Sequence, residues 1–208
     1  MNQTIDLLTS HRSIRKFTDE PVDPDLFTRL VEAAQASASS SFLQGVTIIR
    51  VTDPGKRVAL RDVAGGQAYV ETAPEFLVFC ADLSRPMRCC RQHGGTPAEG
   101  LTEQFVIATV DAALYAQNLV IAAESAGLGI CYIGALRNDP AKVTELLDLP
   151  QQVYPVFGLC LGHPAQDPEV KPRLPVSVTL KTDSYSTDGE DEAIAAYDEE
   201  MRTYYANR

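Results

Sequence analysis

The sequence predicts a fold of alternating helices and strands, of the α+β or α/β class. Segments with apolar residues at helical spacing alternate with short segments that are dense in β-branched residues. The 208 residues include 45% hydrophobic and 22% charged side chains, which is ordinary for a globular protein. This length suits one domain with a substantial core, and two small domains are the alternative.

Two helices are expected at the start of the chain. Residues 3–9 are predicted to form a short helix that ends before a basic segment. The next helix begins at Asp23 and Pro24, because aspartate at the N-cap and proline in the first turn are usual start signals. Three more elements are then predicted: a strand at 46–51, a helix at 54–63 and a strand at 76–81.

The longest predicted helix spans about residues 102–126 and ends at Gly127 and Gly129. Apolar residues spread widely around it, which indicates a central buried helix or part of a dimer interface. The remaining elements are strands at 130–133 and 153–161, a helix at 140–147 and an acidic, amphipathic helix at 191–206. Residues 164–190 show little periodicity and are expected to cross the surface.

Charge and hydropathy argue against several functions. The chain has 28 acidic and 18 basic residues, a net charge of −10, whereas nucleic-acid binding usually needs a basic stripe. Since no apolar run approaches 18 residues, no membrane span is expected. The first residues lack the basic region and apolar core of a secretory signal, so the protein is expected to be cytoplasmic.

The five cysteines do not suggest a disulfide framework. Cys80, Cys131 and Cys160 lie in apolar runs and are expected to be buried. Cys89 and Cys90, with His93 nearby, could bind a soft metal or form a redox pair. No fourth ligand is in view, so we interpret all three as incidental loop residues and predict no metal site.

The most informative segment is His-Arg-Ser-Ile-Arg-Lys-Phe at residues 11–17, which places four potentially cationic side chains in an acidic chain. If it is helical or turn-like, Arg12 and Arg15 project to one side, and guanidinium groups bind phosphate well. A second basic pair, Lys171 and Arg173, flanks a stiffening proline. Local charge alone favours the interpretation that both are solvated surface patches.

The segment at residues 11–17 resembles the opening motif of the FMN-dependent nitroreductase family. Further matches, in order and spacing, point to its group A of oxygen-insensitive NADPH nitroreductases and NADPH-flavin oxidoreductases. They are Ser39–Gln44, Gly65–Gln67, Ala122–Gly129, Tyr132–Gly134, Phe157–Gly162 and Lys171–Pro175. The match covers essentially the whole chain, with a small insertion around residues 89–95. The resemblance implies an α+β nitroreductase-like fold with a central, mostly antiparallel sheet flanked by helices. It also implies an intertwined homodimer in which residues 1–208 form a single FMN-binding domain.

The resemblance further implies a set of FMN-binding residues. It assigns the phosphate to His11, Arg12 and Arg173. The reduced ring gathers negative charge, and Arg15 and Lys171 are the implied cations that ease its reduction. The full implied set is His11, Arg12, Ser13, Arg15, Ser39, Ser40, Ser41, Gln67, Tyr132, Ile133, Gly134, Ala135, Lys171 and Arg173.

The other members of this set would make polar or backbone contacts. Ser13 and Gln67 can hydrogen-bond the ribityl chain or the ring edge. The three hydroxyls of residues 39–41 suit contacts across a dimer interface, and a polar loop is the alternative. Gly134 would let the backbone approach the flavin. Ala135 departs from the family, which commonly has a second glycine there, so its contact is less secure.

The implied reaction needs no protein nucleophile or general acid, so no catalytic residue is predicted. FMN would be bound, with NADPH as electron donor and NADH possible, and it would pass hydride equivalents to nitroaromatics, quinones or related acceptors by ping-pong kinetics. One alternative is a flavin reductase that supplies reduced FMN to a partner enzyme. Another is a flavin-binding redox sensor without turnover.

Two residues are implied at the substrate and NADPH side of the site. Phe42 is expected to line the substrate pocket, unless it belongs to the core. Arg208 matches one of several basic residues that the family carries at its C-terminal tail and that are associated with the NADPH 2′-phosphate. The rest of that tail is absent from the sequence. If the chain is this short, we expect a weak preference for NADPH over NADH.

Overall fold

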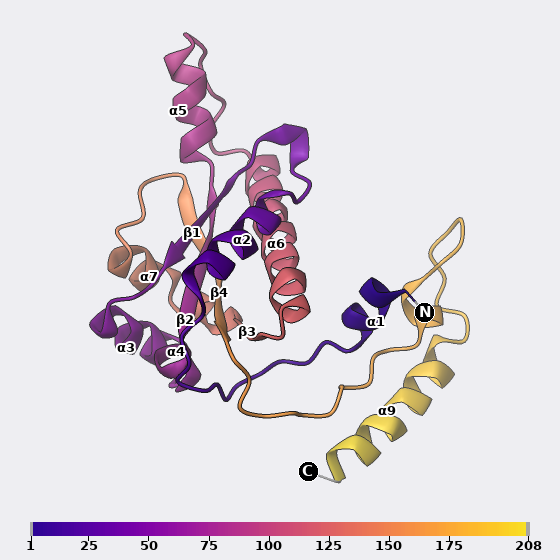
Figure 1. Cartoon of the computed structure of the whole chain (residues 1–208). Helices are drawn as coiled ribbons and strands as arrows, with labels where there is room; N and C mark the ends of the chain where they lie inside the picture. The colour runs from indigo at the N-terminus through magenta and orange to yellow at the C-terminus, as the bar shows by residue number, and fades with distance from the viewer. Residues whose placement is uncertain (1, 207–208) are drawn as a thin grey trace. The chain divides into compact units, whose positions relative to one another are not determined.

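The structure is a computed structural model that describes residues 2–206 (Figure 1). It divides into two compact units, of which the first ends at Asp167 and the second begins at Pro168. The single FMN-binding domain expected over residues 1–208 stays a prediction.

A four-stranded antiparallel sheet forms the centre of the first unit. Its spatial order is β1 (Val46–Arg50), β2 (Glu75–Asp82), β4 (Val153–Gly162) and β3 (Gly129–Ile133). All three strand pairs are antiparallel, with Cys131 of β3 opposite Cys160 of β4. The expected antiparallel sheet of an α+β fold is therefore confirmed.

Helices cover both faces of this sheet (Figure 1). On one side lie α2 (Pro24–Gln35) and α6 (Thr102–Ser125), and on the other lie α3 (Pro54–Val63), α4 (Tyr69–Thr72) and α7 (Pro140–Leu146). Successive β2 residues point to opposite faces, as in any strand. Phe76 and Val78 pack in the core of the α3 side, whereas Leu77 and Phe79 pack in the core of the α2 side.

Three of these helices begin at an Asp-Pro pair. The Asp23 carboxylate accepts a hydrogen bond from the Leu26 amide at 2.8 Å, and Asp53 and Asp139 cap α3 and α7 in the same way. Aspartate satisfies an amide that has no partner within the helix, and proline supplies the helical φ. This local chemistry explains why the starts of α2, α3 and α7 can be predicted from the sequence.

Several short elements were not predicted. They are η1 (Ser40–Phe42), α4, α5 (Ser84–Gln92), η2 (Gly134–Asn138) and α8 (Val176–Thr179). Cys89 and Cys90 therefore lie on a helix, not in the expected loop. The helix is strongly polar, and Met87 is its buried residue. Burial of Cys80, Cys131 and Cys160 is confirmed.

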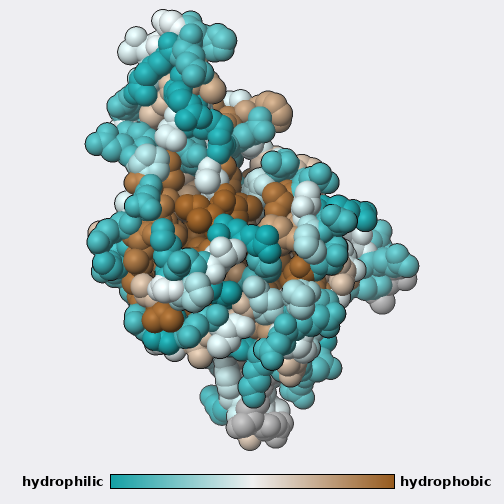
Figure 2. Space-filling model, turned by 60° about the vertical axis from the view of Figure 1, so that its left-hand side comes forward, coloured by the Kyte–Doolittle hydropathy of each residue, from teal (hydrophilic) through white to brown (hydrophobic). Residues whose placement is uncertain are grey.

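Helix α6 has two different faces. Its buried side consists of Ala108, Asp111, Ala112, Ala116, Leu119, Val120 and Ala123. Its other side exposes the large apolar residues Phe105, Val106, Val110 and Leu114. Figure 2 shows one face of the molecule on which hydrophobic residues gather below the segment that holds α5.

By length and composition alone, α6 could cross a membrane, with a mean hydropathy of 1.6 over its most apolar stretch. The expected absence of a membrane span stays a prediction. The core helix of a globular protein passes the same test, and α6 packs against α2 and the sheet and carries the buried acid Asp111.

The N-terminal helix α1 (Gln3–Thr9) belongs to the first unit, and α9 (Glu190–Ala206) is the main element of the second. Within the second unit, Lys181 Nζ lies 2.6 Å from Glu190 Oε1. The Tyr197 hydroxyl donates to the Pro172 carbonyl at 3.3 Å. These contacts attach α9 to the irregular chain that precedes it.

Candidate functional site

The basic segment at residues 11–17 is not helical. The Ile14 amide donates to the Ile130 carbonyl of β3 at 2.8 Å, and the buried Ile14 side chain anchors the segment. Phe17 forms an isolated bridge with Pro164. Because the chain runs past the sheet without helical turns, Arg12 and Arg15 do not share one side, contrary to the helical alternative.

Gly129 makes this close approach possible. A Cβ atom at position 129 would lie 2.6 Å from Ile14 Cγ1 and 2.8 Å from Ile14 Cβ, well inside van der Waals contact. The absence of a side chain on β3 thus determines where the basic segment runs.

We expect Gly129→Ala to destabilise the protein by about 1–3 kcal/mol, the usual effect of forcing an extra carbon into a packed site. The displaced segment should also weaken FMN binding. Thermal unfolding and FMN titration measure both effects. Gly45→Ala is the control, since its nearest neighbour would be the Asp82 carbonyl oxygen at 3.5 Å, an ordinary van der Waals contact, and it should change little. Unchanged stability and affinity in Gly129→Ala would contradict this account of the segment.

His11 and Arg12 each face a carboxylate. His11 Nδ1 lies 2.6 Å from Glu124 Oε1 at the end of α6, and Arg12 Nη2 donates to Asp167 Oδ1 at 2.5 Å. A cavity of about 600 Å³ opens beside them. Its lining is Leu7, Ser10, Arg12, Ile14, Glu124, Gly127, Leu128, Gly129, Pro164, Gln166 and Asp167. The Asp167 side chain is 84% exposed, so a phosphate could replace it as the partner of Arg12.

Arg15 lies in a different cluster, with Tyr69 and Gln67. The Tyr69 hydroxyl donates to Gln67 Oε1 at 2.5 Å, and Gln67 Nε2 donates to the Ala64 carbonyl at 2.8 Å. Burial raises the pKa of Tyr69, and this outweighs the hydrogen bond from Arg15, which acts to lower it. Tyr69 is therefore a neutral hydrogen-bonding group at pH 7.

Within residues 2–206, Arg15 has no carboxylate within ion-pair distance. Its charge is thus available to an electron-rich ligand, as a reduced flavin ring would be. Arg15 and Gln67, two of the predicted residues, are brought together by Tyr69. Sequence reasoning missed Tyr69, although an aromatic residue with a hydroxyl two positions after Gln67 was a usable signal.

The residues at the end of β3 could contact a ligand mainly through their backbone atoms. The Tyr132 ring makes an edge contact with Phe157, with centroids 5.1 Å apart, and its hydroxyl donates to Gln117 Oε1 of α6 at 3.4 Å. Ile133 is buried in the core. The side chains of Tyr132 and Ile133 thus already pack or hydrogen-bond within the protein, so a ligand contact here would come from the main chain.

The next two residues are tightly packed. A Cβ atom at Gly134 would lie 2.9 Å from Arg137 Nη2, and Ala135 packs against the apolar core of the α3 side. Ser13, which is half-buried, lies in the extended segment between Arg12 and Ile14. The flavin contacts expected of Ser13, Gly134 and Ala135 stay predictions.

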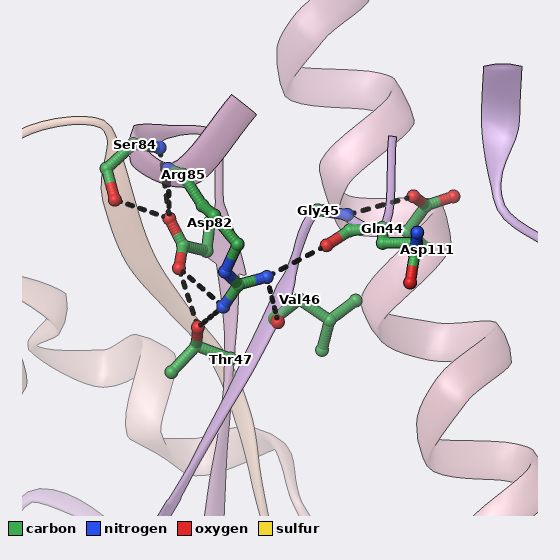
Figure 3. A network of polar contacts seen from close by, with 8 residues as sticks. All are labelled: Gln44, Gly45, Val46, Thr47, Asp82, Ser84, Arg85 and Asp111. Carbon is green, nitrogen blue, oxygen red and sulfur yellow. Dashed lines mark hydrogen bonds and ion pairs between the residues drawn. The ribbon is translucent and has the colours of Figure 1, made fainter. Parts of the chain in front are cut away.

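A third group lies at the loop of residues 39–45. Ser39 Oγ donates to Asp111 Oδ2 of α6 at 2.6 Å, and the Ser40 amide donates to Asp111 Oδ1 at 3.1 Å. The Gly45 amide reaches Asp111 Oδ2 at 3.4 Å (Figure 3). The Ser39 hydroxyl is thus committed to Asp111. Phe42 is 79% exposed, so it is not a core residue of this chain.

A polar network connects this loop to the start of α5 (Figure 3). Arg85 Nη1 donates to the carbonyls of Gln44 and Val46, both at 3.1 Å, and Arg85 Nη2 lies 3.2 Å from Asp82 Oδ2. Burial acts to raise the pKa of Asp82. Hydrogen bonds from Ser84, from Thr47 and from the Arg85 amide, together with the Arg85 charge, outweigh burial and lower that pKa.

We expect this network to give the protein a pH-dependent stability. Since the folded pKa of Asp82 is lowered, its contribution is present above the unfolded pKa of about 3.9 and is lost as pH falls through the folded pKa. Asp82→Asn should therefore reduce the free energy of unfolding by about 2 kcal/mol at pH 7. The difference from wild type should shrink below about pH 3.

Urea unfolding at both pH values measures this difference. Asp62→Asn is the control, since the Asp62 side chain is 64% exposed and an exposed ion pair with Arg61 contributes little. A difference between wild type and Asp82→Asn that is the same at both pH values would contradict the assignment.

Two groups of predicted residues in the first unit contact α6 at different points along the helix. Ser39 and Ser40 bind Asp111, whereas His11 lies against Glu124. Thirteen residues of helix separate these two acids, a distance of about 20 Å at 1.5 Å per residue. One chain therefore does not bring residues 39–41 to the His11 end.

Two predicted residues belong to the second unit. Lys171 Nζ lies 5.2 Å from the centroid of the Tyr205 ring, and Arg173 is exposed. Arg208 lies outside the described residues. The roles assigned to all three stay predictions.

Two family models match the sequence: the nitroreductase family over residues 8–163 and the C-terminal domain of the nitroreductase family over residues 171–208. An oxygen-insensitive NADPH nitroreductase of Salmonella typhimurium is 48% identical over 208 residues, covering all of this chain and 85% of that protein. An NADPH-flavin oxidoreductase of Vibrio harveyi is 49% identical with the same coverage. The crystal structure of nitroreductase A from Vibrio parahaemolyticus matches with a TM-score of 0.94 at 50% identity, covering 100% of this chain and 86% of that one.

Proposed function

This chain belongs to the nitroreductase family, and we propose that it is an FMN-dependent NAD(P)H oxidoreductase that reduces nitroaromatics, quinones or related small acceptors. The named activities of its relatives, an NADPH nitroreductase and an NADPH-flavin oxidoreductase, support this proposal. With a quinone, NADPH and one proton would give NADP⁺ and the hydroquinone, a balanced two-electron reduction.

The observation that carries the proposal is the cluster of Arg15, Gln67 and Tyr69. FMN, when bound, supplies the two-electron chemistry between nicotinamide and acceptor. Arg15 would stabilise the negative charge that a reduced ring gathers, because no carboxylate among residues 2–206 neutralises it. Gln67 and Tyr69 would fix the ring edge by hydrogen bonds. His11 and Arg12 would hold the phosphate.

We further propose that two copies of the chain pair through α6 and share each flavin site. The exposed apolar residues Val106, Val110 and Leu114 form a stripe of the kind that marks a protein interface. The loop of residues 39–42 lies about 20 Å from the His11 end of the same chain, by helix geometry. A second copy could bring its own loop, with the exposed Phe42, to that end.

The remaining features follow from the same proposal. Lys171, Arg173 and Arg208 keep the roles that the family resemblance assigns to them, toward the flavin for the first two and toward NADPH for the third. The net charge of −10 supports small-molecule partners over nucleic acid. We propose a cytoplasmic enzyme with no membrane partner.

An absorbance spectrum of the purified protein, followed by anaerobic addition of NADPH, tests the proposal. We expect flavin bands that bleach on addition and return when nitrofurazone or a quinone is added. A protein that stays colourless after incubation with FMN would contradict it. Bleaching that no acceptor reverses would favour the redox sensor, and turnover with free FMN alone would favour a flavin reductase.

A further inference from the structure

Asp111 differs from the other buried acids of the first unit. Glu75, Asp82 and Asp111 are the buried acidic residues among those the structure describes. Glu75 pairs with Arg50 and Asp82 with Arg85, but no cation of residues 2–206 lies within ion-pair distance of Asp111. Its side chain is stabilised by loop donors instead, and it sits on an otherwise apolar helix face.

All of these donors come from residues 39–45. The Ser39 hydroxyl and the amides of Ser40 and Gly45 converge on the two carboxylate oxygens. A buried charge is costly unless hydrogen bonds compensate it. The loop and Asp111 therefore depend on each other.

The loop is held in an unfavourable backbone conformation. Ser41, Phe42 and Gln44 have φ values of 49°, 55° and 51°, in the left-handed region that non-glycine residues seldom adopt. The Gln44 amide donates to Ser39 Oγ at 2.7 Å, so Ser39 connects Asp111 to the strained turn. Such strain persists where surrounding contacts determine the conformation, and it often marks functional segments.

A second anchor acts from the opposite side. Arg85 donates to the carbonyls of Gln44 and Val46, and Asp82 holds Arg85 in place (Figure 3). The base of the loop is thus fixed by α6 on one side and by the start of α5 on the other. Its apex, with Phe42 79% exposed, makes few contacts within the chain.

We propose that Asp111 is a positioning residue, which fixes the loop so that Ser41 and Phe42 contact the flavin and the acceptor. This rests on the proposed function, in which the loop completes the site of a second copy. Asp111 itself touches neither ligand. A carboxylate that only stabilised the fold would have no selective effect on the acceptor.

Three variants and one control test the proposal. Asp111→Ala removes both carboxylate oxygens that accept hydrogen bonds from the loop. Asp111→Asn keeps one oxygen for the Ser40 amide. Ser39→Ala removes the hydroxyl that connects Asp111 to the Gln44 amide. Ser39→Ala also guards against a failure of Asp111→Ala to fold. Thr109→Val is the matched control, since the Thr109 hydroxyl on the same helix contacts Tyr154 and the Phe105 carbonyl.

For Asp111→Ala we expect hydrogen exchange in residues 38–45 to rise at least tenfold and the KM for nitrofurazone to rise about tenfold. At saturating NADPH, the rate at which the flavin-saturated protein is bleached should change less than about twofold, because hydride transfer to the ring depends on Arg15, which lies elsewhere. Asp111→Asn should recover part of both losses. Ser39→Ala should resemble Asp111→Asn, and Thr109→Val should match wild type.

Faster exchange with an unchanged KM would overturn the positioning role, as would equal losses of bleaching and acceptor use. An effect of Thr109→Val equal to that of Asp111→Ala would also overturn it. If the wild-type protein binds FMN and bleaches, and the Asp111 and Ser39 variants have the same exchange rates and KM as wild type, this inference alone is contradicted. A wild-type protein that binds no FMN would contradict the proposed function and this inference with it.

Discussion

Replacement of Arg15 by glutamine is expected to slow reduction of bound FMN by NADPH about 100-fold, the usual effect of losing one preorganised group that stabilises developing charge. Arg15 faces Tyr69, and no carboxylate among the described residues competes for its charge. Glutamine keeps hydrogen-bonding capacity but not the charge. Anaerobic stopped-flow bleaching at saturating FMN measures the step directly.

Arg29→Gln is the matched control for this prediction. Arg29 is an exposed arginine on α2, so its loss should leave the bleaching rate within about twofold of wild type. If Arg15→Gln bleaches as fast as Arg29→Gln, the assignment of Arg15 to the ring is wrong.

Val110→Glu is expected to convert the proposed dimer into monomers and to weaken FMN binding. Val110 is 49% exposed at the centre of the apolar stripe on α6. An unpaired charge buried at an interface costs about 3 kcal/mol, which raises the dimer Kd more than 100-fold. Each monomer would then lack the loop of its partner. Sedimentation velocity and FMN titration measure the two effects.

Ala141→Glu adds the same charge to an exposed position of α7 and serves as the control. It should leave both the mass and the FMN affinity unchanged. A Val110→Glu protein with the wild-type mass and affinity would exclude α6 as the interface.

Elements whose signals are local could be predicted from the sequence. Asp23 caps α2 through the Leu26 amide, three residues away, and the same chemistry starts α3 and α7. The strand at 46–51 could be predicted from its density of β-branched residues. Short α5 was missed because it is strongly polar overall and Met87 is its one buried residue.

Features that depend on distant partners could not be predicted. The basic segment is extended because Ile14 bonds to Ile130 and packs over Gly129, which lie more than a hundred residues later. Asp111 is one acid in an apolar helix, and its partner Ser39 is 72 residues earlier. Recognition of the family motif supplied the candidate residues, but which of them share an end of the molecule is a property of the fold.

Hybrid dimers test the central claim, that one flavin site is built from two copies of the chain. Arg15→Gln impairs the ring side, and Ser41→Asp with Phe42→Asp, tolerated in left-handed backbone, impairs the loop. When the two inactive proteins are refolded together, half of the dimers should be hybrids, each with one intact site. The mixture should then regain about a quarter of wild-type nitrofurazone reduction, as random pairing of a twofold-symmetric dimer requires. A mixture no more active than its two components would show that each site lies within a single chain, and would contradict the account.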